Sequence, residues 1–417
     1  MVAQKFLEWA QTASIGERVA AAGVLARAFL DGDLAEPGRE EARLVLTALL
    51  DDSSFLVRRA IAGHFASAAH VPHYMVLTLA GDHPDIAALV LARSPLLSDA
   101  ELIDFAATSE AFAQSAIALR PSVSAPVAAA LAEVGACEAL TALAENPGVE
   151  LLAFSIRRMI ERHGEDARLR AALLARPDLP AALRSDIAGA SAQAVASLIA
   201  GTTQLAPGKV RLLTREAHER ANVQIAAESA GEANGAANFV AHLRGAGQLT
   251  AGLLLRALLC GNTHLLAVAL SELTGMPVAR AAGFVAKSKS AGFAALYRKA
   301  RMPERVLPAF IAGLQAVAKT HCASPLNARL RQPIVAWVLQ ACESINRGEL
   351  DSLIARLRRL EAEAAREEAR DFHQAVVEAS HAAQSPEHSR RRLPRVTLAA
   401  APERPKRPAK VAELAAA

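Results

Sequence analysis

A short phrase ending in proline recurs along the first half of this 417-residue chain. An apolar residue, an alanine and two variable residues precede the proline in LARSP, IALRP and LAENP, which end at Pro95, Pro121 and Pro147, and a shortened copy, LARP, ends at Pro177. The successive spacings are 26, 26 and 30 residues. Repeats of this length indicate stacked supersecondary units, each of which buries its apolar face against its neighbours.

Each copy of the phrase predicts the end of one helix and the corner that leads to the next. Proline cannot continue a helix, and it pushes the residue before it toward an extended conformation. The residues that follow favour new helix starts: Ser98 and Glu101 form a capping-box pattern. Asn146 and Pro147 are predicted as the N-cap and first residue of a helix that ends at Gly164. The phrase is therefore interpreted as a corner between antiparallel helices.

Helical patterns extend on both sides of the phrase. Upstream, Val57, Ile61 and Phe65 recur every four residues, and Asp51 or Asp52 is the predicted cap of that helix. Downstream, residues 247–285 predict three helices separated by glycine-containing turns, with Thr250 as the cap of the first. The chain shows no alternation of apolar and polar residues long enough for a strand.

The composition fits closely packed helices. The hydrophobic fraction is 52% but aromatic residues make up only 4%, so the apolar content is mostly alanine, leucine, valine and isoleucine. We predict an all-α fold, an α-solenoid of HEAT-like antiparallel helix pairs, with a charged helix and a disordered tail at the C-terminal end. The predicted parts are helical repeats over 1–200, a continuing repeat or bundle region over 201–345, a charged amphipathic helix over 346–385 and the tail over 386–417.

The charged segment near the C-terminal end has one apolar stripe. Its large members are Leu353, Leu357 and Leu360, followed by Ala364. Charged residues three apart, such as Glu363 with Arg366 and Glu367 with Arg370, are predicted to pair along the helix surface. The helix is interpreted as a terminal cap or as a coiled-coil arm, and the cap is favoured because barely two heptads of large apolar residues are present.

The tail carries the basic charge of the whole chain. Residues 1–385 have a formal net charge of −1, whereas residues 386–417 have +5. The tail's basic residues are Arg390, Arg391, Arg392, Arg395, Arg404, Lys406, Arg407 and Lys410. Such a tail is a candidate for electrostatic contact with nucleic acid or an anionic membrane surface, but it lacks aromatic residues for base stacking. A flexible, solubilising tether is the favoured interpretation.

No catalytic or cofactor-binding motif is present, so neither catalysis nor a cofactor is expected. His70 and His73 are spaced for one helix face, but no third metal ligand lies near them in the sequence. The cysteines are far apart and are expected to be reduced and buried; they are Cys137, Cys260, Cys322 and Cys342. No signal peptide or membrane span is evident, so we expect a soluble, cytoplasmic protein.

Three arginines lie beside the corner prolines: Arg93, Arg120 and Arg176. In the favoured interpretation, each cation lies near a helix C-terminus, where the helix dipole stabilises it. In the alternative, the three form an exposed ladder that receives an acidic partner segment or a phosphate.

The order of these segments resembles a family of mainly alphaproteobacterial proteins, domain of unknown function 2336. The resemblance rests on VRRAIA after an acidic turn, LARSPLLSDAEL, AIALRPSVS, LAENPGVEL and ARPDLPAAL, then GQLTAGLLLRALLCGN, the LTGMP turn and GFAALYRKARMP. Together these motifs cover roughly residues 45–320. The resemblance implies an all-helical repeat fold, and it implies no catalytic residue or substrate.

Three functions fit the sequence. The favoured hypothesis is a scaffold or adaptor without catalytic activity that binds another protein through the solenoid surface. The first alternative is a nucleic-acid-associated protein that uses the basic tail and the solenoid as a cradle, although the balanced charge of the body disfavours it. The second alternative is an enzyme or small-ligand binder with a pocket between helices.

Overall fold

The computed structural model describes residues 2–32, 34–202, 205–231, 234–287, 291–320, 328–345 and 350–384. Within these ranges every long element is a helix, and β-type pairing is limited to an isolated bridge between Val123 and Val149. The basic residues predicted for the tail, from Arg390 to Lys410, lie outside the described residues. No helix in the described ranges is long and apolar enough to cross a membrane.

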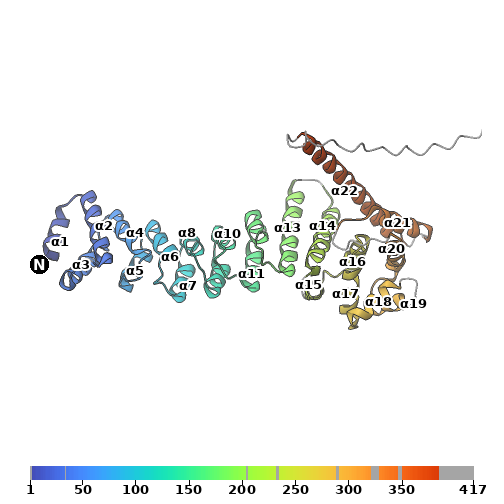
Figure 1. The fold of residues 1–417 in the computed structure, drawn as a ribbon, viewed down its shortest axis with the longest axis horizontal. Coiled ribbons are helices and arrows are strands. Elements are labelled where there is room, and N and C mark those ends of the chain that lie inside the picture. Colours follow the sequence, from blue (N-terminus) through green and yellow to red (C-terminus); the bar gives the residue numbers. More distant parts are fainter. Residues whose placement is uncertain are drawn as a thin grey trace, which may run out of the picture.

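The first half of the chain forms a two-layered row of helices, here called the helical-repeat array (Figure 1). Throughout the layer of even-numbered helices, and in part of the layer of odd-numbered helices, a helix packs against the helix two positions further along the chain. The even-helix layer consists of α2 (Ile15–Asp31), α4 (Phe55–Phe65), α6 (Pro84–Arg93), α8 (Ala111–Ala118), α10 (Cys137–Glu145) and α12 (Ala167–Leu174). The odd-helix layer consists of α1 (Val2–Thr12), α3 (Glu36–Leu49), α5 (His73–Ala80), α7 (Asp99–Thr108), α9 (Ala125–Val134) and α11 (Ala153–His163). The chain thus has the all-α repeat architecture that the sequence predicted.

The proline phrase ends four successive helices of the even-helix layer. Pro95, Pro121, Pro147 and Pro177 follow the ends of α6, α8, α10 and α12 by a few residues. One period of the phrase therefore corresponds to one pair of antiparallel helices, as predicted. The capping box is also present, because Ser98 and Glu101 exchange hydrogen bonds at the start of α7.

The helix predicted to begin at Pro147 begins six residues later, at Ala153. Asn146 does not cap it: its Nδ2 donates to the carbonyl oxygens of Ala118 and Arg120, at 2.8 and 2.7 Å. The following backbone pairs with the preceding corner, where the Val123 amide donates to the Gly148 carbonyl at 3.2 Å. The prediction was wrong because the corner residues bond to the neighbouring unit instead of starting a helix.

The cap predicted for α4 was also wrong. Ser54 occupies the N-cap position, and no side chain there accepts a hydrogen bond from the first turn of the helix. Asp52 instead accepts from the Ser54 amide and pairs with Arg18 on α2, at 2.9 Å. This aspartate links two neighbouring helices of the even-helix layer.

The remaining helices form a second unit, here called the C-terminal bundle. The long helix α13 (Ala181–Thr202) adjoins it. This helix contributes to both hydrophobic cores of the protein: Ile187 belongs to the first core, that of the array, and Ala181 belongs to the second core, that of the bundle. The bundle consists of α14 (Pro207–Glu228), α15 (Gly235–Gly245), α16 (Ala251–Leu259), α17 (Thr263–Thr274), α18 (Val278–Ala286), α19 (Ala291–Lys299), α20 (Leu307–Thr320), α21 (Gln332–Ile345) and α22 (Asp351–Gln384), with the short 3-10 helices η1 (Ser229–Gly231) and η2 (Glu304–Val306). The three helices predicted over 247–285 are α16, α17 and α18, and Thr250 caps the first of them.

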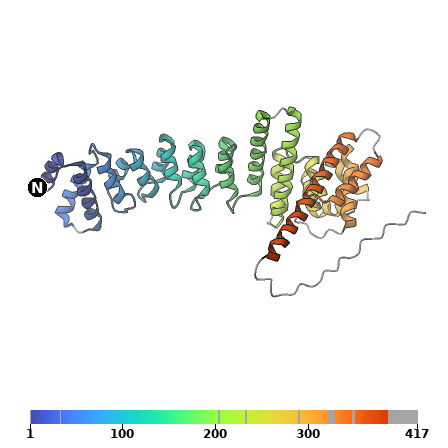
Figure 2. The same ribbon diagram turned by 90° about the horizontal axis from the view of Figure 1, so that it is seen from above.

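The last helix, α22, closes one side of the bundle and then extends beyond it (Figure 2). The apolar stripe that the sequence showed, from Leu353 to Ala364, is buried in the second core. Further along, Phe372 and Val376 are exposed. The first half of α22 is therefore a cap on the bundle, and the second half projects from it.

The contact between neighbouring corners yields a test on two glycines. A Cβ atom on Gly148 would lie 2.0 Å from the Pro121 carbonyl oxygen, whereas one on Gly63, within α4, meets nothing within 4 Å. We expect Gly148→Ala to lower the free energy of unfolding by about 1–3 kcal/mol, because rigid backbone must shift. Gly63→Ala is expected to raise it by about 0.5–1 kcal/mol, since alanine favours the helix. Urea unfolding measures the free energy of unfolding of both variants. Equal changes in the two variants would contradict the contact between the corners.

Candidate functional site

The three arginines beside the prolines occupy two different positions of the corner. Arg120 and Arg176 directly precede their prolines, whereas Arg93 lies one residue earlier, with Ser94 in between. This shift of one residue changes the direction of the side chain. Arg93 is exposed, while Arg120 and Arg176 are partly buried.

Arg120 and Arg176 both bond to the corner of the preceding unit. Arg120 donates to the carbonyl oxygens of Leu91 and Ser94, at 2.5 and 2.7 Å. Arg176 donates to carbonyl oxygens of the corner after α10, among them that of Asn146 at 3.3 Å. The last carbonyl groups of a helix have no partner within that helix. The two arginines supply those partners and have few donors left for another molecule.

The structure therefore does not bring the three arginines together as one exposed ladder. At the corner position of Arg93, the following units have Leu119, Glu145 and Ala175, all of them exposed. This solvent-facing column carries one positive charge, one negative charge and two apolar residues. Burial also lowers the pKa of Arg120, with Asp99 acting in the opposite direction.

Two arginine variants test this difference in role. Arg120→Met removes the donors to two carbonyl groups in a partly buried corner, and we expect it to lower the free energy of unfolding by about 1.5–3 kcal/mol. Arg93→Met changes an exposed residue and should lie within about 0.5 kcal/mol of the unsubstituted protein. Urea unfolding followed by circular dichroism makes the comparison. A similar loss in both variants would mean that charge, and not the bonds to the corner, stabilises the array.

The even-helix layer exposes two large apolar side chains on one stripe of α8. Phe112 is 51% exposed, and Leu119, two turns further at the end of the helix, is 63% exposed. On the adjacent helix α6, Leu89 and Ala92 are half-buried. We call these four residues, Leu89, Ala92, Phe112 and Leu119, the α6–α8 patch.

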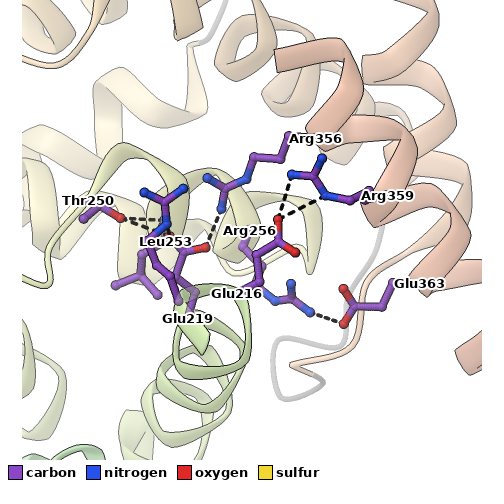
Figure 3. Close-up of polar contacts among 9 residues, drawn as sticks. Glu216, Glu219, Thr250, Leu253, Arg256, Arg356, Arg359 and Glu363 are labelled. Carbon is purple, nitrogen blue, oxygen red and sulfur yellow. Dashed lines mark hydrogen bonds and ion pairs between the residues drawn. The ribbon is translucent and has the colours of Figure 1, made fainter. Parts of the chain in front are cut away.

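A cluster of polar side chains lies in the C-terminal bundle, where α22 crosses α14 and α16 (Figure 3). The α14 helix supplies Glu216 and Glu219, and α22 supplies Arg356 and Arg359. Arg356 pairs with Glu219, which is buried and 3.4 Å from the Thr250 hydroxyl. Arg359 pairs with Glu216 at 2.9 Å. Gly252 allows this arrangement, because a Cβ atom there would lie 2.4 Å from Arg356 Nη1.

The same helices share a more deeply buried group. Arg256 on α16 is 1% exposed and pairs with Glu363 on α22. Arg220 on α14 pairs with Glu363 at 3.3 Å and also with Glu367. The Nε atoms of Arg256 and Arg356 and one oxygen of Glu367 are buried without a hydrogen-bond partner. Paired charges of opposite sign therefore hold α22 against the bundle at successive turns.

The sequence did not reveal this cluster. It predicted that Glu363 and Glu367 pair with Arg366 and Arg370 along α22, but both glutamates pair with arginines of α14 or α16. The partners are separated by more than a hundred residues, for example 107 between Arg256 and Glu363. One signal was available in the sequence: Arg256 lies in the middle of the apolar segment LLLRALL. A charge in such a position indicates a buried partner.

A cavity of about 460 Å³ lies beside the cluster, between α14, α16, η2 and α22. Four arginines line it, namely Arg215, Arg305, Arg356 and Arg359, and no acidic residue is among its lining residues. Apolar side chains such as Leu212, Leu255 and Leu353 form much of the remaining wall. The cavity combines positive charge with apolar surface.

The other residues singled out in the sequence are dispersed. His73 Nε2 lies 2.6 Å from Glu101 Oε1, and His70 is exposed. Cys260 and Cys342 are buried, and burial raises their pKa values to about 12 and about 11. Cys137 is half-buried, and Cys322 lies outside the described ranges. In the part of the chain that the structure describes, no group of three histidine, cysteine, aspartate or glutamate residues is placed to hold a metal ion.

The packing and the corner bonds define an all-helical repeat protein whose array is closed at one end by a helical bundle. The chain belongs to the family of uncharacterised bacterial proteins DUF2336, whose model matches residues 86–348, more than half of the chain. No curated protein and no solved structure matches it.

The ion pairs of α22 yield a third test. Arg356→Met leaves Glu219 buried without its partner, and we expect a loss of about 3–5 kcal/mol in the free energy of unfolding. Arg358→Met, on the exposed side of the same helix, removes a surface pair with Glu343 and should cost at most about 1 kcal/mol. Adding Glu219→Leu to Arg356→Met should recover most of the loss, because no unpaired charge then remains buried. Urea unfolding measures all three variants, and no recovery in the double variant would show that the loss has another origin.

Proposed function

We propose that this protein is a cytoplasmic scaffold without catalytic activity that binds another protein on its helical-repeat array, at the α6–α8 patch. The observation that carries the proposal is the exposure of Phe112 and Leu119 on one stripe of the even-helix layer. Fully burying one such side chain contributes about 1.5–3 kcal/mol. Two of them, two turns apart on one stripe, can therefore anchor a partner.

The polar groups of the array support the same proposal. Arg120, Asn146 and Arg176 bond to the main chain of the preceding corner, and Arg162 donates to the carbonyl oxygens of Ala132 and Gly135. Side chains that bond to their own main chain are poor candidates for recognising a charged partner. The exposed apolar groups Phe112 and Leu119 are the part of this surface on which the proposal rests. Helical-repeat arrays also offer extended surfaces of the kind that protein partners use.

A pair of matched double variants tests the proposal. Phe112→Ser with Leu119→Ser removes the two large exposed side chains of the patch, while Phe154→Ser with Leu44→Ser removes the same residue types, 57% and 51% exposed, from the odd-helix layer. A partner is first identified by affinity purification of the tagged full chain from its own bacterium and is then purified. We expect the patch variant to raise the Kd of the purified pair at least about tenfold, the effect of losing about 1.4 kcal/mol. The odd-layer variant should change it less than about threefold.

Two controls make the result decisive. Urea unfolding confirms that both variants fold as the unsubstituted chain does, and a chain ending at residue 385 shows whether the basic tail takes part. Equal weakening by both double variants would contradict a site at the α6–α8 patch. Loss of the complex on tail removal alone, together with nuclease sensitivity, would favour the nucleic-acid hypothesis instead.

A further inference from the structure

The cavity between α14, α16, η2 and α22 is unusual in its electrostatics. All four ionisable residues in its wall are arginines. Glu219 and Glu216 neutralise two of them, Arg356 and Arg359. The other two are less compensated: Arg215 lies 4.0 Å from the already paired Glu219, and Arg305 has no ion-pair partner among the described residues. The wall therefore carries an excess of about two positive charges.

Most of the remaining wall is apolar. It includes Leu212, Leu255, Val306 and Leu353, and Leu255 and Leu353 are buried in the second core. Like charges that face a partly enclosed, weakly polar space repel one another more strongly than they do in water. An anion between them relieves that repulsion. A purely inorganic anion would leave the apolar wall unused.

We propose that this cavity binds a small organic anion that consists of an apolar body and one carboxylate or phosphate group. Guanidinium groups bind both kinds of oxyanion through two parallel hydrogen bonds. Arg215 and Arg305 are the ligands of the charged group, since they are exposed and are not held in close ion pairs. The leucines and Val306 contact the apolar body. A volume of about 460 Å³ is within the range of known small-molecule sites.

This site does not depend on the proposed scaffold function. It lies in the C-terminal bundle, whereas the α6–α8 patch lies on the array. Failure of one proposal therefore leaves the other intact.

The experiment is a calorimetric titration of the full chain with four probes. Octanoate and octyl phosphate carry the two candidate charged groups on an apolar chain, octylammonium reverses the charge, and inorganic phosphate lacks the apolar body. All are used below their micelle-forming concentrations. We expect saturable binding of one equivalent of octanoate or octyl phosphate, and the tighter of the two identifies the charged group.

Three variants locate the binding. Arg215→Gln with Arg305→Gln should weaken binding at least about tenfold, the effect of losing one charge-assisted hydrogen bond. Arg211→Gln with Arg280→Gln removes the same charge from exposed positions on α14 and α18 outside the cavity wall, and it should change the Kd less than about threefold. Ala355→Phe fills the cavity from an exposed position on α22 and should abolish binding. Unchanged unfolding midpoints show that each variant is folded.

Four results with the organic probes or the variants would overturn the proposal. They are no saturable binding of either anion, equal weakening by the two double-arginine variants, binding that survives Ala355→Phe, and binding of octylammonium as tight as that of the anions. Inorganic phosphate that binds as tightly as octyl phosphate would also overturn it, because the apolar wall would then contribute nothing.

Discussion

The helical-repeat array depends on the hydrogen bonds that one corner donates to the corner before it. A helix leaves its last carbonyl groups without partners, and an array of short helices repeats that deficit at every unit. The residue before the corner proline supplies the missing donors at three successive corners, as Arg120, Asn146 and Arg176. Because each bond joins one unit to the previous one, it stabilises a helix end and fixes the stacking of the two units together.

Much of this architecture could be predicted from the sequence, because helix ends are governed by local chemistry. The proline phrase located four corners, and the pattern of Ser98 and Glu101 located a capping box. The direction of the corner side chains could not be predicted in the same way. Arg93, Arg120 and Arg176 look equivalent as residues near a proline, yet a shift of one position separates an exposed side chain from two that bond to the main chain. The prediction that Asn146 caps a helix was wrong for a related reason. An asparagine side chain can cap a helix, but it can equally bond to a neighbouring corner, as Asn146 does here.

The candidate site in the C-terminal bundle was beyond sequence reasoning because its residues come together only in the folded chain. Rules for pairs three or four residues apart describe an exposed helix. The start of α22 is not exposed on the side that faces α14 and α16, so its charges meet partners from other helices at shorter range and with less solvent screening. Arg256 indicated that a buried charge existed, but only the fold shows that Glu363 is its partner.

The corners of the array and the C-terminal bundle use polar side chains differently, and the two proposed binding sites reflect this difference. At three corners of the array, arginine and asparagine side chains satisfy main-chain groups of the adjacent unit, and the site proposed there for a protein partner is apolar, with Phe112 and Leu119. In the bundle, arginines pair with glutamates across helices, and their number exceeds that of the glutamates around the cavity. The excess follows from how α22 closes the bundle: its apolar stripe completes the core, while its arginines add to those of α14 and η2. A closing helix that carried glutamates at those two positions would have left an excess of about two negative charges around the cavity, with no electrostatic reason to accept an anion.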